Sequence, residues 1–364
     1  MNIRQLTFTR FIAAILIVIY HFRKGVFPFD SWPIYLFSDL NLAVSYFFVL
    51  SGFVMLITYN RLEKIDFFQY IKKRLVRIYP AYLLATLLVL LYWFFYLSKI
   101  DYSGFVLNLL LIQAWIPVKA LAFNYPAWAI AIEFFFYLTF PFLFNYIYKR
   151  HKFRKVFFLI VSFWILSQVV IQFFWLNLRP GGTLAELNFV RFFPLFHLNQ
   201  FLIGNLAGLC FLKFRENIAD HKKFLLLIFI LISGVLLFFD FNLFYKDGLA
   251  APILALFLII LSSSNNFFTR FLSFRPLIFL GELSYGIYIF QKPVFNWVYK
   301  ILSLFGHNSV TLNFYISFLV LIFVAVLSFI FIEKPLRERM KKKQEQFLPR
   351  KTIFNLKKPA IKLR

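Results

Sequence analysis

Charged residues are scarce in this sequence, and acidic residues are the scarcest of them. Only 15% of the 364 residues are charged, and the 15 acidic residues stand against 40 basic ones. A soluble globular domain is usually about half apolar and about a quarter charged, whereas 62% of this chain is hydrophobic. The apolar excess runs along the whole length, which excludes a soluble domain held by one hydrophobic anchor.

Cysteine and several catalytic signatures are missing as well. Cys210 is the single cysteine, so an intrachain disulfide is excluded, and its apolar surroundings are typical of a small packing residue. The sequence has neither a phosphate-binding Gly-x-x-x-x-Gly-Lys loop nor a Gly-x-Ser-x-Gly nucleophile elbow. No cluster has the spacing of metal ligands, so we expect no metal site.

Aromatic and basic residues are abundant instead. The 56 Phe, 19 Tyr and 7 Trp suit lipid-facing helices with aromatic belts at the two interfaces. The net charge of +25 comes largely from Lys and Arg in short loops between apolar segments, as the positive-inside rule predicts. We therefore expect the lipid bilayer as a partner and no nucleic acid.

Apolar segments of the length needed to cross a bilayer, about 20 residues, recur from end to end. The first carries Arg10 and lacks a small-residue cleavage site, so we expect a retained helix and no cleaved signal peptide. The sequence predicts an all-α, polytopic membrane helical bundle built from eleven segments: 6–23, 36–58, 78–98, 103–118, 127–148, 153–176, 193–213, 224–240, 248–264, 277–299 and 311–332.

The basic loops predict the topology. If all eleven segments crossed the membrane, the basic loop 149–155 would lie outside, against the positive-inside rule. Segment 103–118 is the shortest candidate between residues 78 and 148, and Ile116-Pro117 closes it. We interpret it as a re-entrant or surface element on the outer side. This leaves about ten transmembrane helices with both termini in the cytoplasm, together with the basic loops 60–77, 149–155, 213–223 and 265–275.

The chain shows no internal repeat and no linker. Residues 1–340 are expected to form one membrane-embedded domain, and residues 341–364 a basic cytoplasmic tail without regular structure, lying near the anionic inner surface. With short loops throughout, any chemistry must take place within or close to the membrane.

Arg10 and His21 are ionisable residues inside the first apolar segment. A charged side chain in a spanning helix is costly and marks a functional candidate. Their separation of 11 residues is close to three helical turns, so they share one face about 16 Å apart along the axis. Histidine is a natural general base near neutral pH. The alternative is a histidine that is merely tolerated at the interface.

Glu133 is a carboxylate inside segment 127–148. The predicted topology places it at a depth similar to that of His21, where it could orient and polarise the imidazole. Tyr137 follows at i+4 and could add a hydroxyl. A structural hydrogen bond is the alternative role for this carboxylate.

Arg74 and Arg77 are spaced i, i+3 and share one face of a helix. Two guanidinium groups there could bind phosphate as a fork at the cytoplasmic mouth. Ordinary positive-inside charge is the alternative, and it suffices for the neighbouring Lys72 and Lys73.

Smaller polar and glycine positions are weaker candidates. Ser51 and Gly52 favour close helix packing, although a ligand could also approach the backbone there. His197 and Asn199, near the outer end of segment 193–213, could line a polar site for an acceptor. Gly204 and Gly208 have the spacing of a helix-packing motif.

Six short motifs occur in an order that resembles the acyltransferase-3 family of integral membrane O-acyltransferases, over residues 1 to about 340. They are Arg10 followed by ten residues and His21, Tyr46 to Phe53, Arg74 to Pro80, Trp128 to Leu138, Gly281 to Tyr288, and Glu333-Lys334-Pro335. The family includes bacterial polysaccharide and lipopolysaccharide O-acetyltransferases.

The resemblance implies a multi-pass enzyme of the bacterial cytoplasmic membrane. It would move an acyl group, most simply acetyl, from cytoplasmic acyl-CoA as co-substrate to a hydroxyl of an extracytoplasmic glycan, with no bound cofactor and with glycan-assembly proteins as candidate partners. Arg10, Arg74 and Arg77 would bind the donor, and His21 would act as base with Glu133 orienting it.

The chain departs from the family pattern at one place and leaves rival functions open. Gln291-Lys292-Pro293 stands where the family often has His, any residue and Pro, so we assign no catalysis to that helix. A transporter or flippase of sugar or lipid intermediates is the main rival, although the sequence shows no pair of broken-helix repeats. A polysaccharide synthase subunit without chemistry of its own is another.

Overall fold

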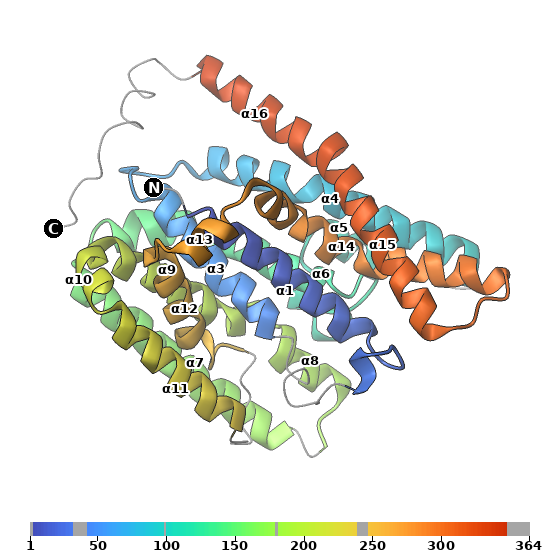
Figure 1. The fold of residues 1–364 in the computed structure, drawn as a ribbon, viewed down its shortest axis with the longest axis horizontal. Helices are drawn as coiled ribbons and strands as arrows, with labels where there is room; N and C mark the ends of the chain where they lie inside the picture. Colours follow the sequence, from blue (N-terminus) through green and yellow to red (C-terminus); the bar gives the residue numbers. More distant parts are fainter. Residues whose placement is uncertain (1–2, 32–41, 98–99, 179–180, 239–246, 348–364) are drawn as a thin grey trace.

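The computed structural model describes residues 3–31, 42–97, 100–178, 181–238 and 247–347. All regular structure within these ranges is helical (Figure 1), which confirms the all-α prediction for them. The longer helices are α1 (Gln5–Phe22), α3 (Leu42–Tyr59), α4 (Phe67–Tyr96), α6 (Ala127–Phe142), α7 (Phe153–Leu178), α8 (Leu184–Phe192), α9 (Pro194–Lys213), α11 (Lys222–Phe238), α12 (Ala251–Ser263), α14 (Arg275–Leu304), α15 (Val310–Ser328) and α16 (Lys334–Phe347).

Seven helical stretches of the described residues are long and apolar enough to cross a membrane. They begin at Gln5, Leu42, Phe67, Ala127, Phe153, Leu184 and Val310. Three further segments of the predicted ten correspond to α11, α12 and α14. The multi-pass architecture is therefore clear, while the count of ten and the side on which each terminus lies stay predictions.

Segment 103–118 forms only short elements. Its helix α5 (Tyr102–Leu109) has 8 residues, or about 12 Å, and cannot cross a hydrocarbon core of about 30 Å. Lys119 Nζ lies 2.8 Å from Asp101 Oδ1 and joins the two ends of the segment. Burial raises the pKa of Asp101, but hydrogen bonds from Lys119 and from the Gly104 N–H outweigh it and bring the pKa to about 2.

Helix α4 begins earlier than the sequence predicts. Asp66 caps it by accepting a hydrogen bond from the Gln69 N–H, so most of the basic stretch assigned to a loop belongs to a helix of 30 residues, about 45 Å long. Lys72 and Lys73 are exposed on it, whereas Arg74 and Arg77 are half-buried.

Glycines set the closest helix contacts at the centre of the bundle. A Cβ on Gly52 of α3 would lie 2.2 Å from the Phe201 carbonyl oxygen, and one on Gly204 of α9 would lie 2.0 Å from the Val49 carbonyl oxygen. No side chain fits in these spaces, so the glycines allow α3 and α9 to approach each other. The packing role predicted for Gly52 and Gly204 is confirmed.

Helix α1 occupies the middle of the bundle between two groups of helices (Figure 1). It contacts α3 and α12 on one side and α14 on the other. Gly281 of α14 lets α1 approach, since a Cβ there would lie 2.0 Å from the Thr7 carbonyl oxygen. Helix α16 follows α15 and runs beside α4, reaching past residue 340, where the tail was predicted to begin; residues 348–364 lie outside the described residues.

Candidate active site

A cavity of about 410 Å³ lies where α1, α3, α4, α6, α14 and α16 meet. Four arginines and two glutamates line it and give its wall a net charge of +2: Arg10, Arg74, Arg77, Arg337, Glu133 and Glu282. Six of the nine residues predicted from the sequence line this cavity: Arg10, Ser51, Arg74, Arg77, Glu133 and Tyr137. A half-apolar cavity with an excess of guanidinium groups is suited to an anionic ligand that carries an apolar portion.

Aromatic rings hold the guanidinium of Arg74. Its Cζ lies 5.4, 5.2 and 5.3 Å from the ring centroids of Tyr59, Tyr70 and Tyr137. The faces of aromatic rings attract a cation that has left water. The three tyrosines therefore fix the position of Arg74 and offset part of the cost of burying its charge.

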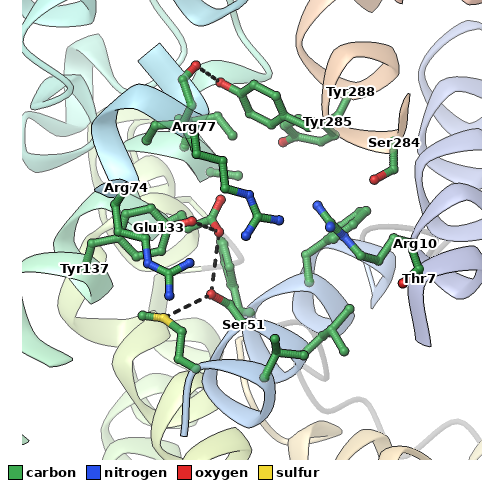
Figure 2. A pocket seen from close by; sticks show the side chains of 18 of the residues that line it. Thr7, Arg10, Ser51, Arg74, Arg77, Glu133, Tyr137, Ser284, Tyr285 and Tyr288 are labelled. Atoms are coloured by element: carbon green, nitrogen blue, oxygen red, sulfur yellow. Dashed lines mark hydrogen bonds between the residues drawn. The ribbon is translucent and has the colours of Figure 1, made fainter. Parts of the chain in front are cut away.

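Glu133 stands among the arginines. The Tyr137 hydroxyl donates a hydrogen bond to its Oε1, and the Ser51 hydroxyl lies 3.5 Å from the same oxygen. Figure 2 shows the guanidinium groups of Arg10, Arg74 and Arg77 directed into the space around this carboxylate, with Arg10 on the opposite side from Arg74. The hydroxyl predicted for Tyr137 is thus used in a hydrogen bond to Glu133, which lies one turn away on α6.

Arg337, from α16, is a cavity residue that the sequence analysis missed. Its Nη2 lies 2.7 Å from Oε2 of Glu333 at i−4. Glu333 is only 1% exposed and ends the π-helical turn η5 (Phe329–Glu333) between α15 and α16. The sequence signal for this contact is the i, i+4 pair of Glu333 and Arg337 directly after the last apolar segment. Arg337 was instead counted among the many basic residues of the tail.

His21 is not among the residues that line the arginine cavity, and the predicted pairing with Glu133 is wrong. Its Nδ1 lies 2.7 Å from Oε1 of Gln291, while the carboxylate of Glu133 binds Tyr137. The depths differ, because His21 is the penultimate residue of α1 whereas Glu133 is the seventh residue of α6, about 9 Å from the start of that helix. Gln291 occupies the position to which the sequence analysis assigned no catalysis.

The segment before α6 is bound to α14 beside His21. Pro293 has no backbone N–H, so it cannot donate the usual helical hydrogen bond to the carbonyl of Ile289. The Asn124 side chain donates a hydrogen bond to that carbonyl instead, at 3.3 Å. The Lys292 ammonium donates to the Phe123 carbonyl at 3.0 Å and lies 5.0 Å from the ring centroid of Tyr125. These contacts place Tyr125 against His21, with ring centroids 4.7 Å apart.

Helix α14 links His21 to the arginine cavity. Tyr288 lines the cavity and precedes Gln291 by three residues, which is about 4.5 Å along a helix. The hydrogen-bond partner of His21 therefore lies within one helical turn of the cavity wall.

His197 and Asn199 have structural hydrogen bonds. Nε2 of His197 donates to the Arg191 carbonyl at 3.0 Å, and the Asn199 side chain donates to the carbonyls of Phe196 and Asp247 at 2.7 and 3.0 Å. Their side chains are buried, and neither residue lines the arginine cavity. The placement favours a role in holding α9 to the segment at Asp247 over the predicted contact with an acceptor.

Fold and sequence together define the class of this protein. Residues 3–333 match the family described as an acyltransferase domain, so the chain belongs to this family of membrane acyltransferases. It is 26% identical to the O-acetyltransferase OatA of Staphylococcus aureus over 97% of this chain and 61% of that protein. It is 23% identical to the peptidoglycan O-acetyltransferase OatA of Listeria monocytogenes, over 90% of this chain and 55% of the relative.

A shorter match links the chain to the acyltransferase MdmB of Streptomyces mycarofaciens, with 28% identity over 56% of each chain. The chain spans about three fifths of the length of the OatA proteins. No solved structure matches it.

Proposed function

We propose that this protein is a membrane-bound O-acyltransferase that moves an acetyl group from cytoplasmic acetyl-CoA to a hydroxyl of an extracytoplasmic glycan. Membership of the acyltransferase family and the names of the OatA relatives support acetyl transfer. The peptidoglycan named for the Listeria relative makes a cell-wall glycan the first acceptor to test. The observation that carries the proposal is the arginine-lined cavity inside the bundle.

The cavity suits the phosphate-bearing part of the donor. Guanidinium groups bind phosphate through paired, charge-assisted hydrogen bonds, and Arg74 and Arg77 present two such groups from one face of α4. A second hollow of about 510 Å³ shares Glu282 and Arg337 with the cavity and is also lined by Lys334 and Glu338. We assign this hollow as the route by which the donor enters.

His21 acts as the general base at the other end of the donor site. Nε2 of its ring accepts the proton of the acceptor hydroxyl while the hydroxyl oxygen attacks the thioester carbonyl carbon. The tetrahedral intermediate then breaks its C–S bond, and the imidazolium returns the proton to the departing thiolate. The products are the acetyl ester and free coenzyme A, and His21 is neutral again.

Glu133 takes a role different from the one predicted from the sequence. Its carboxylate lies among Arg10, Arg74 and Arg77, where it offsets part of their mutual repulsion before the donor binds. The hydrogen bonds from Tyr137 and Ser51 hold it in place. A donor phosphate then meets guanidinium groups that are already positioned.

The test is acetyl transfer by the purified full chain in lipid nanodiscs, with radiolabelled acetyl-CoA and isolated cell-wall glycan. We expect label in the glycan, a glycan mass increased by one acetyl group, and loss of both with His21→Ala. The double variant Arg74→Ala, Arg77→Ala should lose donor binding, whereas Lys72→Ala, Lys73→Ala, which removes two exposed charges from the same helix, should keep it. Movement of a glycan intermediate across the membrane of sealed proteoliposomes, without any acetyl-CoA turnover, would instead identify a transporter.

A further inference from the structure

Gln291 is joined to other groups at both ends of its side-chain amide. Its Nε2 donates a hydrogen bond to the Tyr288 carbonyl oxygen at 2.7 Å, one turn back on α14. Its Oε1 lies 2.7 Å from Nδ1 of His21, a residue 270 positions away in the sequence. The side chain is fully buried, at 0% exposure.

The first of these bonds determines the direction of the second. A backbone carbonyl only accepts hydrogen bonds, so the NH₂ end of the amide must face Tyr288. The opposite orientation would set two acceptor oxygens against each other at 2.7 Å. The carbonyl end of the Gln291 amide therefore faces His21, and it too can only accept.

We infer that Gln291 is a positioning residue that holds His21 in the tautomer with the proton on Nδ1. In neutral imidazole one ring nitrogen donates and the other accepts. Because Nδ1 must donate to Gln291, the lone pair is left on Nε2. Tyr125 packs edge-on against the ring at an interplanar angle of 86°, so the ring plane is restrained as well. This inference rests on the proposed function, in which Nε2 accepts the proton of the acceptor hydroxyl.

A glutamine at this place differs chemically from a carboxylate. It orients the ring and selects the tautomer without bringing a negative charge into the bundle. His197 offers an internal comparison, because its Nε2 donates to the Arg191 carbonyl and its Nδ1 lies 3.0 Å from the Gln200 side-chain nitrogen. The structure thus assigns opposite tautomers to His21 and His197.

Nitrogen-15 NMR of the full chain, labelled in histidine and reconstituted in lipid, tests this assignment directly. The spectrum distinguishes the two tautomers, and His21→Phe identifies the signals of His21. We expect the Nδ1–H form for His21 and the Nε2–H form for His197. Finding the Nε2–H form, or an equal mixture of both, for His21 in the unchanged protein would overturn the inference.

Variants separate positioning from mere packing. Gln291→Leu should leave a mixture of tautomers and lower kcat with the KM for acetyl-CoA unchanged. We expect a loss of about 10- to 100-fold, by analogy with groups that orient metal-binding histidines. Gln291→Glu, with the oxygen that faces the Tyr288 carbonyl protonated, keeps an acceptor at Nδ1 and should retain the Nδ1–H form. Gln113→Leu is the matched control, because Gln113 is also fully buried and donates to a backbone carbonyl, that of Ala127.

The outcomes distinguish this inference from the proposed function. If the protein transfers no acetyl group, the proposed function fails, but the NMR spectrum still decides the tautomer. If the protein is active and Gln291→Leu keeps both the Nδ1–H form and its kcat, the positioning role is refuted. An equal loss of kcat in Gln113→Leu would also refute it, since any buried glutamine would then have the same effect.

Discussion

Removing the Arg77 guanidinium should weaken donor binding far more than removing any exposed charge from the same helix. Arg77 lines the cavity, is half-buried and points into the space around Glu133 (Figure 2). A hydrogen bond to a charged group contributes about 1.5–3 kcal/mol, which corresponds to a loss of about 10- to 150-fold in affinity. Arg77→Ala should therefore raise the Kd for coenzyme A by about that factor.

Isothermal titration of coenzyme A into the purified protein measures this change. Lys73→Ala is the control, because Lys73 lies on the same helix, carries the same charge and is exposed outside the cavity. An exposed charge contributes at most about 1 kcal/mol and is screened by salt, so its loss should change the Kd by no more than a few-fold. Equal effects of the two substitutions, or an Arg77→Ala protein that binds as tightly as the original, would refute the assignment of the cavity as the donor site.

Three further results are expected. Gly204→Ala should destabilise the protein by about 1–3 kcal/mol through overpacking and lower its thermal midpoint. Gly234→Ala is the control and should leave the midpoint unchanged, because a Cβ there meets nothing within 4 Å. Equal midpoints for the two variants would contradict the α3–α9 packing. The pKa of Asp101 is lowered to about 2 from 3.8, so its stabilising contribution should be present above about pH 4 and vanish as the pH falls toward 2. The measurement is the stability difference between the original protein and Asp101→Asn at pH 6 and at pH 2. The same difference at both pH values would show that the ion pair contributes nothing. Glu333→Gln should lower both the thermal midpoint and the affinity for coenzyme A, because it removes the carboxylate that holds Arg337. Adding Arg337→Met should recover the thermal midpoint but not the affinity. Recovered affinity in the double variant would exclude Arg337 from donor binding.

The sequence by itself determined the class of fold and four of the six charged residues in the cavity wall. Long apolar segments form helices in lipid because every backbone polar group must be satisfied within the segment. A charge inside such a segment is costly and is retained only where it is paired or meets a cavity. For this reason Arg10 and Glu133 could be selected without coordinates, and both line the cavity together with Arg74 and Arg77.

Only the tertiary structure decided which of these residues meet. The helix ends were predicted to within one residue, since α1 ends at Phe22 and α6 begins at Ala127. A hydropathy pattern does not give the shift of each helix along its axis or its rotation about it, which packing against neighbouring helices sets. A shift of one helical turn, about 5.4 Å, is longer than a hydrogen bond and is enough to change a partner. Gln291 reaches His21 across 270 positions, and Arg337 reaches the cavity because α16 packs beside α4. Both placements depend on packing between distant helices. The local i, i+4 pair of Glu333 and Arg337 marks the arginine but does not show what it faces.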